Sequence, residues 1–413
     1  MTGPVTVALV GLGGYGGTYL RALLDPAHAD RVQLVAGIDP EPHRCKDIDE
    51  LRARGIHLFT GYDGFLGQAR ADLVVISSPI HLHAEQTCRA LAQGMHVLCE
   101  KPLCSTIQDA ERMSEAHRAS GRHAAIGYQW SYAPAISAAK RDIMAGRFGA
   151  ARLLKTKALW PRTLGYYGRS PWAGALRSRE GEWVLDSPVN NATAHFLHNA
   201  FFCLGRARDA SARPESVVAE LYRANEIGNY DTAALRARMP DGAEVFYIAS
   251  HAADPETETC FSYRFERGAI EYRRGTESVI TGVFDDGSRK EFGSADDHDD
   301  LEKLWAMIAA IRGGETPACP PSAALAQTLC MNGAQESMRE ITSFPASMVE
   351  TTGAGDERRR FVPGLHAELS RCYDEAKLPS ELGFRWARPG IPIDLTNYRS
   401  FPSDSGQRFE AAH

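Results

Sequence analysis

Lys101 stands in a sequence context that could support acid–base chemistry. It lies in the run Cys99-Glu100-Lys101-Pro102, directly after the strand expected at residues 96–99. The proline favours an extended backbone for the lysine, and a lysine fixed at a strand end can transfer protons when burial or a nearby positive charge lowers its pKa. The alternative is a surface lysine in a turn, and spacing alone does not decide between the two.

A second group lies on one predicted helix. Asn191, His195 and His198 fall at i, i+4 and i+7, which places them on one helical face. The preceding run Asp-Ser-Pro at residues 186–188 predicts the start of this helix, with Asp186 interpreted as a cap. A histidine in an apolar helix is more often a core residue than a catalytic one, so the spacing alone favours a structural role.

The stretch from residue 6 to residue 24 predicts a phosphate-binding turn. An apolar run at residues 7–10 is followed by Gly11, Gly13 and Gly16 in the pattern G-x-G-x-x-G, and then by apolar residues with helical spacing. Strand, glycine turn and helix in this order are typical of a dinucleotide-binding unit, whose diphosphate binds at the helix N-terminus.

Asp39 ends the second apolar run, at residues 32–38, where an acidic residue is expected to meet the adenosine ribose. A carboxylate accepts hydrogen bonds from the ribose hydroxyls and repels a 2′-phosphate, so the sequence favours NAD over NADP. Arg44 is close enough in sequence to weaken that preference. The alternative is that Asp39 only caps a helix starting at Pro40.

Strands and helices alternate up to about residue 127, which predicts a parallel sheet covered by helices. We expect helices near 14–24, 41–54, 64–69, 83–93 and 106–120. The expected strands are 5–10, 32–38, 57–59, 72–77, 96–99 and 123–127. The predicted fold class is therefore α/β, with an N-terminal Rossmann doubly wound parallel sheet.

From residue 216 to residue 293 the pattern changes to strand, turn, strand, which predicts a C-terminal α+β domain with a largely antiparallel open sheet. The predicted domains are 1–127 for NAD binding, 128–343 for substrate binding and oligomerisation, and 344–413 as an extension that wraps the surface or a partner subunit.

Two aromatic and polar clusters suit a hydroxyl-rich ligand, because aromatic faces contact C–H surfaces while amides and phenols bind hydroxyls. Both could instead be a hinge or an interface surface. The first contains Tyr128, Gln129 and Trp130; the second contains Arg162, Tyr166, Tyr167, Arg169 and Trp172.

Composition narrows the class of protein. The chain has 413 residues, a formal net charge of -6 and nine cysteines, and none of the cysteines forms a C-x-x-C pair. The charge argues against nucleic-acid binding and membrane adsorption, and the cysteine pattern argues against a disulfide framework or a structural zinc site. We therefore expect no metal, no membrane span and a cytoplasmic protein.

The chain resembles the Gfo/Idh/MocA oxidoreductases, typified by glucose–fructose oxidoreductase and inositol dehydrogenase. The resemblance rests on GLGGYG at residues 11–16, Asp39, SSPIHLH at 77–83 and above all GMHVLCEKPL at 94–103. It covers roughly residues 5 to 340 and implies an NAD(P)-dependent enzyme acting on sugars, cyclitols or their derivatives.

The resemblance also implies roles for single residues. In the family, the lysine that Lys101 matches lies beside the nicotinamide, and the histidine that His195 matches belongs to a D-x-x-x-H pair. Asn191 stands where that aspartate is expected, so it can orient a hydroxyl but cannot take its proton. His198 also replaces a residue that is usually acidic in the family.

The predicted site residues fall into three groups. The catalytic residues are Lys101, His195 and Asn191. The cofactor-binding residues are Gly11, Gly13, Gly14, Tyr15, Gly16, Asp39, Ser78, Pro79, His83, Glu100, Lys101 and Gln129. The substrate-binding residues are Lys101, Tyr128, Trp130, Arg162, Tyr166, Tyr167, Trp172, Asn191, His195 and His198.

Three functions remain open at this point. The first is an NAD-dependent dehydrogenase acting on a secondary hydroxyl of a sugar or cyclitol. The second is a redox-neutral glycosidase or epimerase, in which transient oxidation acidifies a neighbouring C–H and the hydride then returns. The third is a non-catalytic NAD(H) sensor. By analogy with the family, we also expect a homo-oligomer, either a dimer or a tetramer.

Overall fold

The computed structural model describes residues 3–275, 278–297 and 299–403. The chain forms two compact units, each assembled from separate segments. Unit 1 contains residues 1–104, 109–132 and 299–324, and unit 2 contains residues 105–108, 133–298 and 325–413. Residues 404–413 of the predicted extension lie outside the described residues.

Unit 1 is built on a six-stranded parallel sheet with the order β3-β2-β1-β4-β5-β6. Its central strands are buried along their whole length, as expected for a parallel sheet covered on both faces. The predicted fold class and all six strands are confirmed. The strands are β1 (Val5–Val10), β2 (Val32–Ile38), β3 (His57–Phe59), β4 (Leu73–Ile76), β5 (His96–Cys99) and β6 (Ala124–Ile126).

The helices between these strands begin close to the predicted positions, with one exception. The helix predicted over 41–54 is wrong as a continuous element, because Cys45 is extended and separates a short 3-10 turn from the helix after it. The elements are α1 (Gly16–Leu24), η1 (Pro26–His28), η2 (Pro42–Arg44), α2 (Ile48–Ala53), α3 (Tyr62–Gln68), η3 (Ile80–Leu82), α4 (His83–Ala92), α5 (Ile107–Ser120) and η4 (Gln129–Tyr132).

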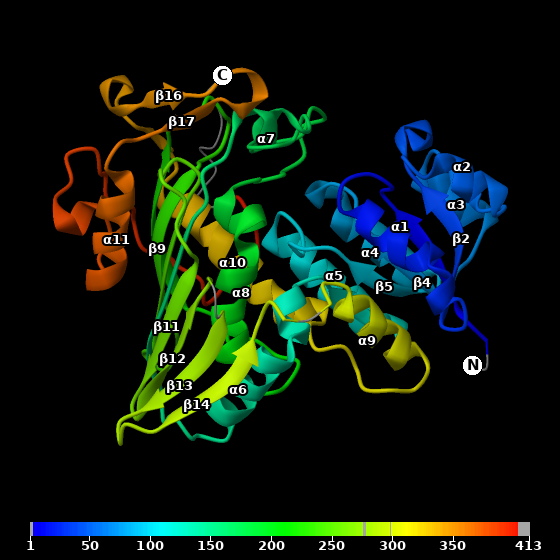
Figure 1. Ribbon diagram of the computed structural model, residues 1–413, viewed down its shortest axis with the longest axis horizontal. Helices are drawn as coiled ribbons and strands as arrows, with labels where there is room; N and C mark the ends of the chain where they lie inside the picture. Colours follow the sequence, from blue (N-terminus) through cyan, green and yellow to red (C-terminus); the bar gives the residue numbers. More distant parts are fainter. Residues whose placement is uncertain (1–2, 276–277, 298, 404–413) are drawn as a thin grey trace. The chain divides into compact units, whose positions relative to one another are not determined.

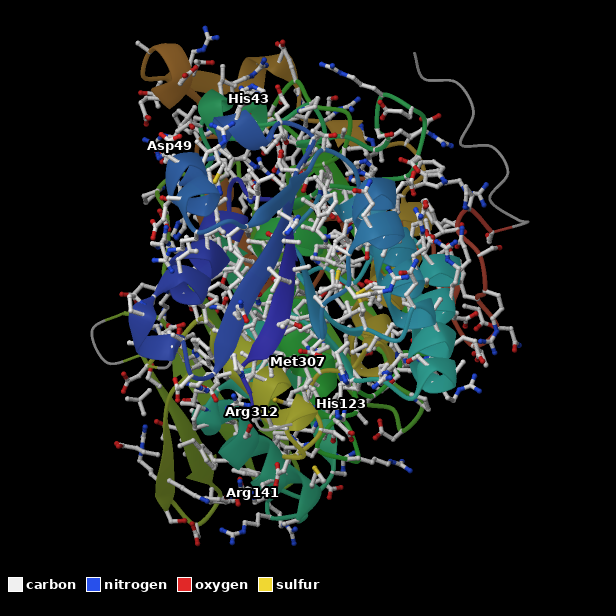
Figure 2. The ribbon with its side chains drawn as sticks, turned by 90° about the vertical axis from the view of Figure 1, so that its right-hand side faces the viewer. His43, Asp49, His123, Arg141, Met307 and Arg312 are labelled. Atoms are coloured by element: carbon white, nitrogen blue, oxygen red, sulfur yellow. The ribbon has the colours of Figure 1, made fainter. Side chains whose placement is uncertain are left out.

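A helix from much later in the chain, α9 (Glu302–Ile311), completes unit 1. Arg312, which follows its last residue, donates from Nη2 to the backbone oxygen of Asp30 at 2.9 Å (Figure 2). The guanidinium of Arg31 lies 4.3 Å from the centre of the Trp305 ring. These contacts hold α9 against the N-terminal half of the unit, and they bring Lys303 on α9 to the β5 end of the sheet.

Unit 2 is built on a ten-stranded, largely antiparallel sheet in which only the β7–β10 and β8–β15 pairs are parallel. This confirms the predicted open sheet. Its strands are β7 (Ala151–Leu159), β8 (Ser216–Arg223), β9 (Thr232–Arg238), β10 (Glu244–Ser250), β11 (Cys260–Phe265), β12 (Gly268–Arg273), β13 (Val279–Phe284), β14 (Arg289–Ser294), β15 (Thr342–Ser343) and β18 (Ile393–Asp394).

Helices lie on both faces of this sheet (Figure 1). On one face are α6 (Pro134–Met144) and α8 (Ala194–Cys203). The hydroxyl of Tyr263 on β11 accepts a bond from Asn199 of α8 at 3.1 Å. On the other face, Lys155 of β7 donates to the backbone oxygen of Tyr373 in α11 (Leu365–Glu375) at 2.9 Å. Because successive side chains of β7 point to opposite faces of the sheet, Lys155 faces one helix layer and its buried neighbours face the other.

The helix predicted to carry Asn191 and His195 together is wrong as one element. Residues 188–192 form a π-helical turn, η5 (Pro188–Ala192), and α8 begins only after Thr193, whose φ of -114° and ψ of 12° interrupt the helix. Ser187 caps the turn by accepting from the Asn190 amide. Asn191 and His195 therefore lie on two successive elements rather than on one helical face.

The described part of the extension, residues 344–403, packs on unit 2. The ring centres of Trp386 and of Tyr222 on β8 lie 4.8 Å apart, and Arg236 of β9 donates from Nη2 to Glu381 Oε2 at 2.8 Å. The remaining elements of this unit are α7 (Leu164–Gly168), η6 (Ala346–Met348), β16 (Glu350–Thr352), η7 (Gly355–Glu357), β17 (Arg359–Phe361), η8 (Ser380–Leu382) and, from residue 325 onward, α10 (Pro321–Ser337). Among the described residues, no helix is both long and apolar enough to cross a membrane.

Candidate functional site

The glycine turn after β1 has the geometry that its sequence predicts. Gly11 has a φ of +84°, and a Cβ placed there would lie 2.6 Å from the Ser77 carbonyl oxygen. A Cβ on Gly16 would lie 1.9 Å from the Gly11 oxygen, so only glycine lets α1 pack this closely on the turn. A Cβ on Gly13 would meet nothing within 4 Å. The turn is therefore crowded on its protein side and open at Gly13.

The same turn presents unused backbone donors. The amides of Gly13, Gly14 and Tyr15 donate to no acceptor in the part of the chain that the structure describes, whereas the Gly16 amide donates to the Gly13 oxygen at 3.0 Å. Amides at a helix N-terminus favour an anion, and the open side of Gly13 leaves room for one. The residues present thus fit the diphosphate of a dinucleotide.

Asp39 follows β2 and is tied to the turn. Its Oδ2 accepts from the Leu12 amide at 2.9 Å, and its Oδ1 accepts from the Glu41 amide at 2.9 Å. The nearby Arg44 forms an exposed pair with Glu41 at 2.7 Å. Asp39 therefore fixes the spacing between the β1 and β2 ends, and each carboxylate oxygen keeps a further lone pair that a ribose hydroxyl could use.

His83 joins the loops that follow β4 and β5. Its Nδ1 lies 2.9 Å from the Pro102 oxygen and its Nε2 lies 2.9 Å from the Ser78 oxygen. Burial lowers the pKa of this imidazole, although both carbonyl contacts act in the opposite direction. A neutral imidazole donates from one nitrogen only, so His83 forms a hydrogen bond to either the Pro102 or the Ser78 oxygen and lies in contact with the other.

Glu100, next to Lys101, is the centre of a buried polar network. Its Oε1 accepts from Lys303 Nζ at 2.5 Å and from the Tyr19 hydroxyl at 2.6 Å. Lys303 also donates to the Tyr15 hydroxyl at 3.2 Å. Both members of the ion pair are almost fully buried. The network therefore connects the glycine turn, α1, the end of β5 and α9.

Both partners of this pair are charged. Burial by itself would raise the pKa of Glu100, but the Lys303 ammonium and the hydrogen bonds from Lys303 and Tyr19 outweigh it and leave that pKa below its usual value. Burial by itself would lower the pKa of Lys303, and the attraction of Glu100 more than compensates. Neither group can lose its charge without leaving the other buried and uncompensated.

This network also holds the backbone of Lys101, because the Lys101 amide donates to Glu100 Oε2 at 3.1 Å. Its side chain is partly exposed. Three other predicted residues follow β6. Tyr128 and Trp130 are buried within unit 1, and the side-chain Nε2 of Gln129 donates to Asp300 Oδ1 at 3.1 Å. Their predicted contacts with cofactor and substrate stay predictions.

In unit 2, the interpretation of Asp186 as a helix cap is wrong, because Ser187 supplies the cap. The Asp186 carboxylate instead accepts from the Gly174 amide at 2.6 Å and from Asn191 Nδ2 at 2.7 Å. Asp186 is only 2% exposed. It therefore fixes the orientation of the Asn191 amide and joins η5 to the loop around Gly174.

His195 and His198 lie on α8 in different surroundings. His195 is partly exposed, near the first turn of the helix. His198 is almost fully buried and stacks on Phe202 with ring centres 5.6 Å apart. Burial, assisted by the charge of Lys140, lowers the pKa of His198 to about 3, so it is neutral at physiological pH. Their contacts with substrate stay predictions.

The predicted aromatic loop lies on α7 and its flanking segments. Arg162, Tyr166 and Tyr167 converge on the buried His251 at the end of β10, and Trp172 lies farther along, 5.2 Å from the guanidinium of Arg169. The structure thus brings the predicted loop residues together around a histidine that the sequence did not single out.

Sequence reasoning missed two residues, Lys303 and His251. Lys303 did carry a signal, since it shares a helical face with Met307 and Ala310 in an otherwise apolar helix and is buried with them. His251 follows β10 directly and carries no spacing pattern that would mark it. Lys101 belongs to unit 1, whereas Asn191 and His195 belong to unit 2.

Comparison with known proteins identifies the N-terminal part. Residues 5–128 match the family model GFO_IDH_MocA, described as an oxidoreductase family with an NAD-binding Rossmann fold. The chain is 35% identical over 144 residues to 1,5-anhydro-D-fructose reductase of Ensifer adhaerens, which is 34% of this chain and 41% of that protein. It is 27% identical over 202 residues to inositol 2-dehydrogenase 2 of Saccharopolyspora erythraea, which is 46% of this chain and 57% of that protein. The chain thus spans about half the length of these relatives.

Solved structures extend the likeness to both units. The WlbA dehydrogenase of Bordetella pertussis, in complex with NADH and UDP-GlcNAcA, has a TM-score of 0.66 and 24% identity over 82% of this chain and 97% of that one. GenD2 from gentamicin A biosynthesis, in complex with NAD, has a TM-score of 0.63 and 18% identity over 82% of this chain and 95% of that one. At these identities the likeness supports the fold alone. The match to the oxidoreductase family model with an NAD-binding Rossmann fold is confined to residues 5–128, within unit 1.

Proposed function

We propose that this protein is an NAD-dependent oxidoreductase acting on a secondary hydroxyl of a sugar, cyclitol or sugar derivative. The observation that carries the proposal is the glycine turn, open at Gly13 and lined by amides without a protein acceptor, beside a Lys101 backbone fixed by Glu100. The named relatives, a sugar reductase and an inositol dehydrogenase, support the substrate class.

Unit 1 would hold the cofactor. The amides of Gly13, Gly14 and Tyr15 would bind the diphosphate, and Asp39 would accept bonds from the adenosine ribose. The carboxylate favours NAD, since a 2′-phosphate next to it would be repelled. When bound, the nicotinamide supplies the acceptor for a hydride.

Oxidation removes a hydride from carbon and a proton from the attached hydroxyl, and the protein must accept that proton. We assign the acceptance of this proton to Lys101 or His195. The Asn191 amide, held by Asp186 at 2.7 Å, orients the hydroxyl without accepting its proton. The reacting carbon must be held close to the nicotinamide, which supplies much of the acceleration.

The test is a panel of sugars, cyclitols and aryl glycosides incubated with the full chain and NAD, following NADH absorbance and aglycone release together. A dehydrogenase accumulates NADH with a free sugar or cyclitol. Aglycone release without net NADH would instead identify a redox-neutral glycosidase, and isomerised sugar without NADH would identify an epimerase. NAD binding with no turnover on any substrate would favour a sensor. The cytoplasmic location and the dimer or tetramer stay predictions.

A further inference from the structure

Arg162 in unit 2 is a cation without a protein acceptor. Its guanidinium carbon lies 5.4 Å from the centre of the Trp160 ring and 5.0 Å from that of Tyr166. Its Nε is buried, and the guanidinium donates no hydrogen bond to any residue in the described ranges. A guanidinium has five donors, and aromatic faces supply attraction but no hydrogen-bond acceptor. The two rings hold the charge in place and leave its donors unused.

Two further basic groups meet the same Tyr166 ring. The Arg169 guanidinium carbon lies 3.7 Å from its centre, and the His251 ring lies 5.4 Å away at 80°. His251 is 2% exposed; its Nδ1 is 3.2 Å from the Tyr167 hydroxyl, and its Nε2 is buried without a partner among the described residues. Burial and both arginines lower the pKa of His251, so the ring is neutral. If Tyr167 donates to Nδ1, the ring proton is on Nε2, which is then an unused donor in addition to those of Arg162.

The acidic side chain paired with this cluster does not balance it. Asp186 lies 3.7 Å from Arg169 Nη2, and its oxygens already accept from the Gly174 amide and from Asn191. A second carboxylate, the buried Asp231, acts on Tyr167, but within the described residues neither Asp186 nor Asp231 forms an ion pair with Arg162. The arginine side chains, the two tyrosines and Trp160 are all at least partly exposed, so a ligand can reach them.

We propose that these six residues form a subsite for an oxyanion carried by the sugar substrate. They are Trp160, Arg162, Tyr166, Tyr167, Arg169 and His251. This deepens the proposed function, on which it rests, because it makes the substrate an acidic sugar, bearing a carboxylate or a phosphate. The Arg162 fork would bind two oxygens, and the aromatic rings would contact the C–H face of the sugar.

Calorimetric titration of the NADH-loaded protein with matched ligands tests this. The ligands are D-glucose, D-glucuronate and D-glucose 6-phosphate, and the corresponding set based on galactose. We expect at least one anion to bind ten-fold or more tightly than its neutral sugar. Arg162→Gln should remove that preference and leave the affinity for the neutral sugar unchanged. Arg162→Lys should retain more of the preference for the phosphate ligand than of the preference for the carboxylate ligand, since lysine lacks the planar fork.

The matched control is Arg177→Gln. Arg177 also stacks on an aromatic ring of unit 2, Trp183 at 3.5 Å, but it already donates to the Gly181 oxygen. The Arg177→Gln variant should bind each anionic sugar with the same affinity as the unmodified protein. Equal binding of neutral and acidic sugars by the unmodified protein, or an equal loss of both in Arg162→Gln, would overturn the subsite. The titration needs no turnover, so it can succeed or fail independently of the proposed oxidation, which the NADH assay reports.

Discussion

Lys303 Nζ lies 2.5 Å from Glu100 Oε1, in a pair that joins a late helix to the residue preceding Lys101. The two residues are 203 positions apart in the chain. Because the Lys101 amide also bonds to Glu100, the geometry of the predicted catalytic lysine depends on a helix that the cofactor motif does not include. Lys303 therefore acts as a positioning residue for the turn that carries Lys101.

Replacing Lys303 with methionine should destabilise the protein by about 3–5 kcal/mol, because the Glu100 carboxylate is left buried without its partner. The double variant Lys303→Met/Glu100→Gln removes both charges and should recover most of that loss. Urea denaturation of the two variants measures the difference. If the single and double variants were equally unstable, the pairing would not be the source of the effect.

The same pair predicts a pH dependence of stability. The pKa of Glu100 is lower in the folded protein than in the unfolded chain, so its stabilising contribution is present above the usual glutamate pKa of about 4.3 and is lost as the pH falls below it. The pKa of Lys303 is raised, so its contribution is present below about 10.4 and is lost as the pH rises through the folded value. The free energy of unfolding should therefore fall faster in acid for the unmodified protein than for Lys303→Met/Glu100→Gln. Parallel pH curves for the two proteins would contradict this.

The elements that the sequence predicts correctly are those determined by residues adjacent in the chain. The strands of unit 1 are short apolar runs bounded by turns. The turn after β1 requires a φ of +84° at Gly11, a backbone conformation that favours glycine. The break at Thr193 was missed because the contacts beside it, from Asn191 and from the Gly174 amide to Asp186, follow no local sequence pattern. Lys303 was missed for the same reason, since its partner is distant in sequence. Local patterns predict elements, whereas these contacts form only once the elements pack.

Two glycine variants separate binding from folding. Gly13→Ala adds a methyl group with no atom within 4 Å, in a backbone conformation open to alanine, so stability should change by less than about 0.5 kcal/mol. Its NADH affinity should fall at least ten-fold if the diphosphate approaches there. Gly16→Ala places a carbon 1.9 Å from the Gly11 oxygen and should cost about 1–3 kcal/mol of stability. Fluorescence titration with NADH and thermal unfolding measure the two effects, and unchanged NADH affinity in Gly13→Ala would argue against the cradle.

Cofactor preference should follow the charge of Asp39. Asp39→Asn keeps an oxygen that can accept from the Leu12 or Glu41 amide but removes the repulsion of a 2′-phosphate. The ratio of kcat/KM for NADP to that for NAD should rise about ten-fold or more, equivalent to about 1.4 kcal/mol. The control is Asp49→Asn, a neighbouring aspartate whose side chain is 96% exposed (Figure 2). An unchanged ratio in Asp39→Asn would mean that Asp39 has only its structural role.

Lys101→Met tests the proton-transfer proposal most directly. The turn is held through the backbone amide of Lys101, and this bond to Glu100 does not depend on the lysine side chain. NADH affinity is measured beside kcat, because Lys101 is also a predicted cofactor-binding residue. If the lysine takes part in proton transfer, kcat should fall about 10²- to 10⁴-fold. Lys377→Met is the matched control and should keep full activity, since it removes an exposed lysine whose ammonium, within the described ranges, pairs with Glu375 alone. If both residues serve the same proton transfer, Lys101→Met/His195→Gln should lose little more than the worse single variant. Full additivity of the two losses would show that they act independently, and full activity in Lys101→Met would remove the lysine from the mechanism.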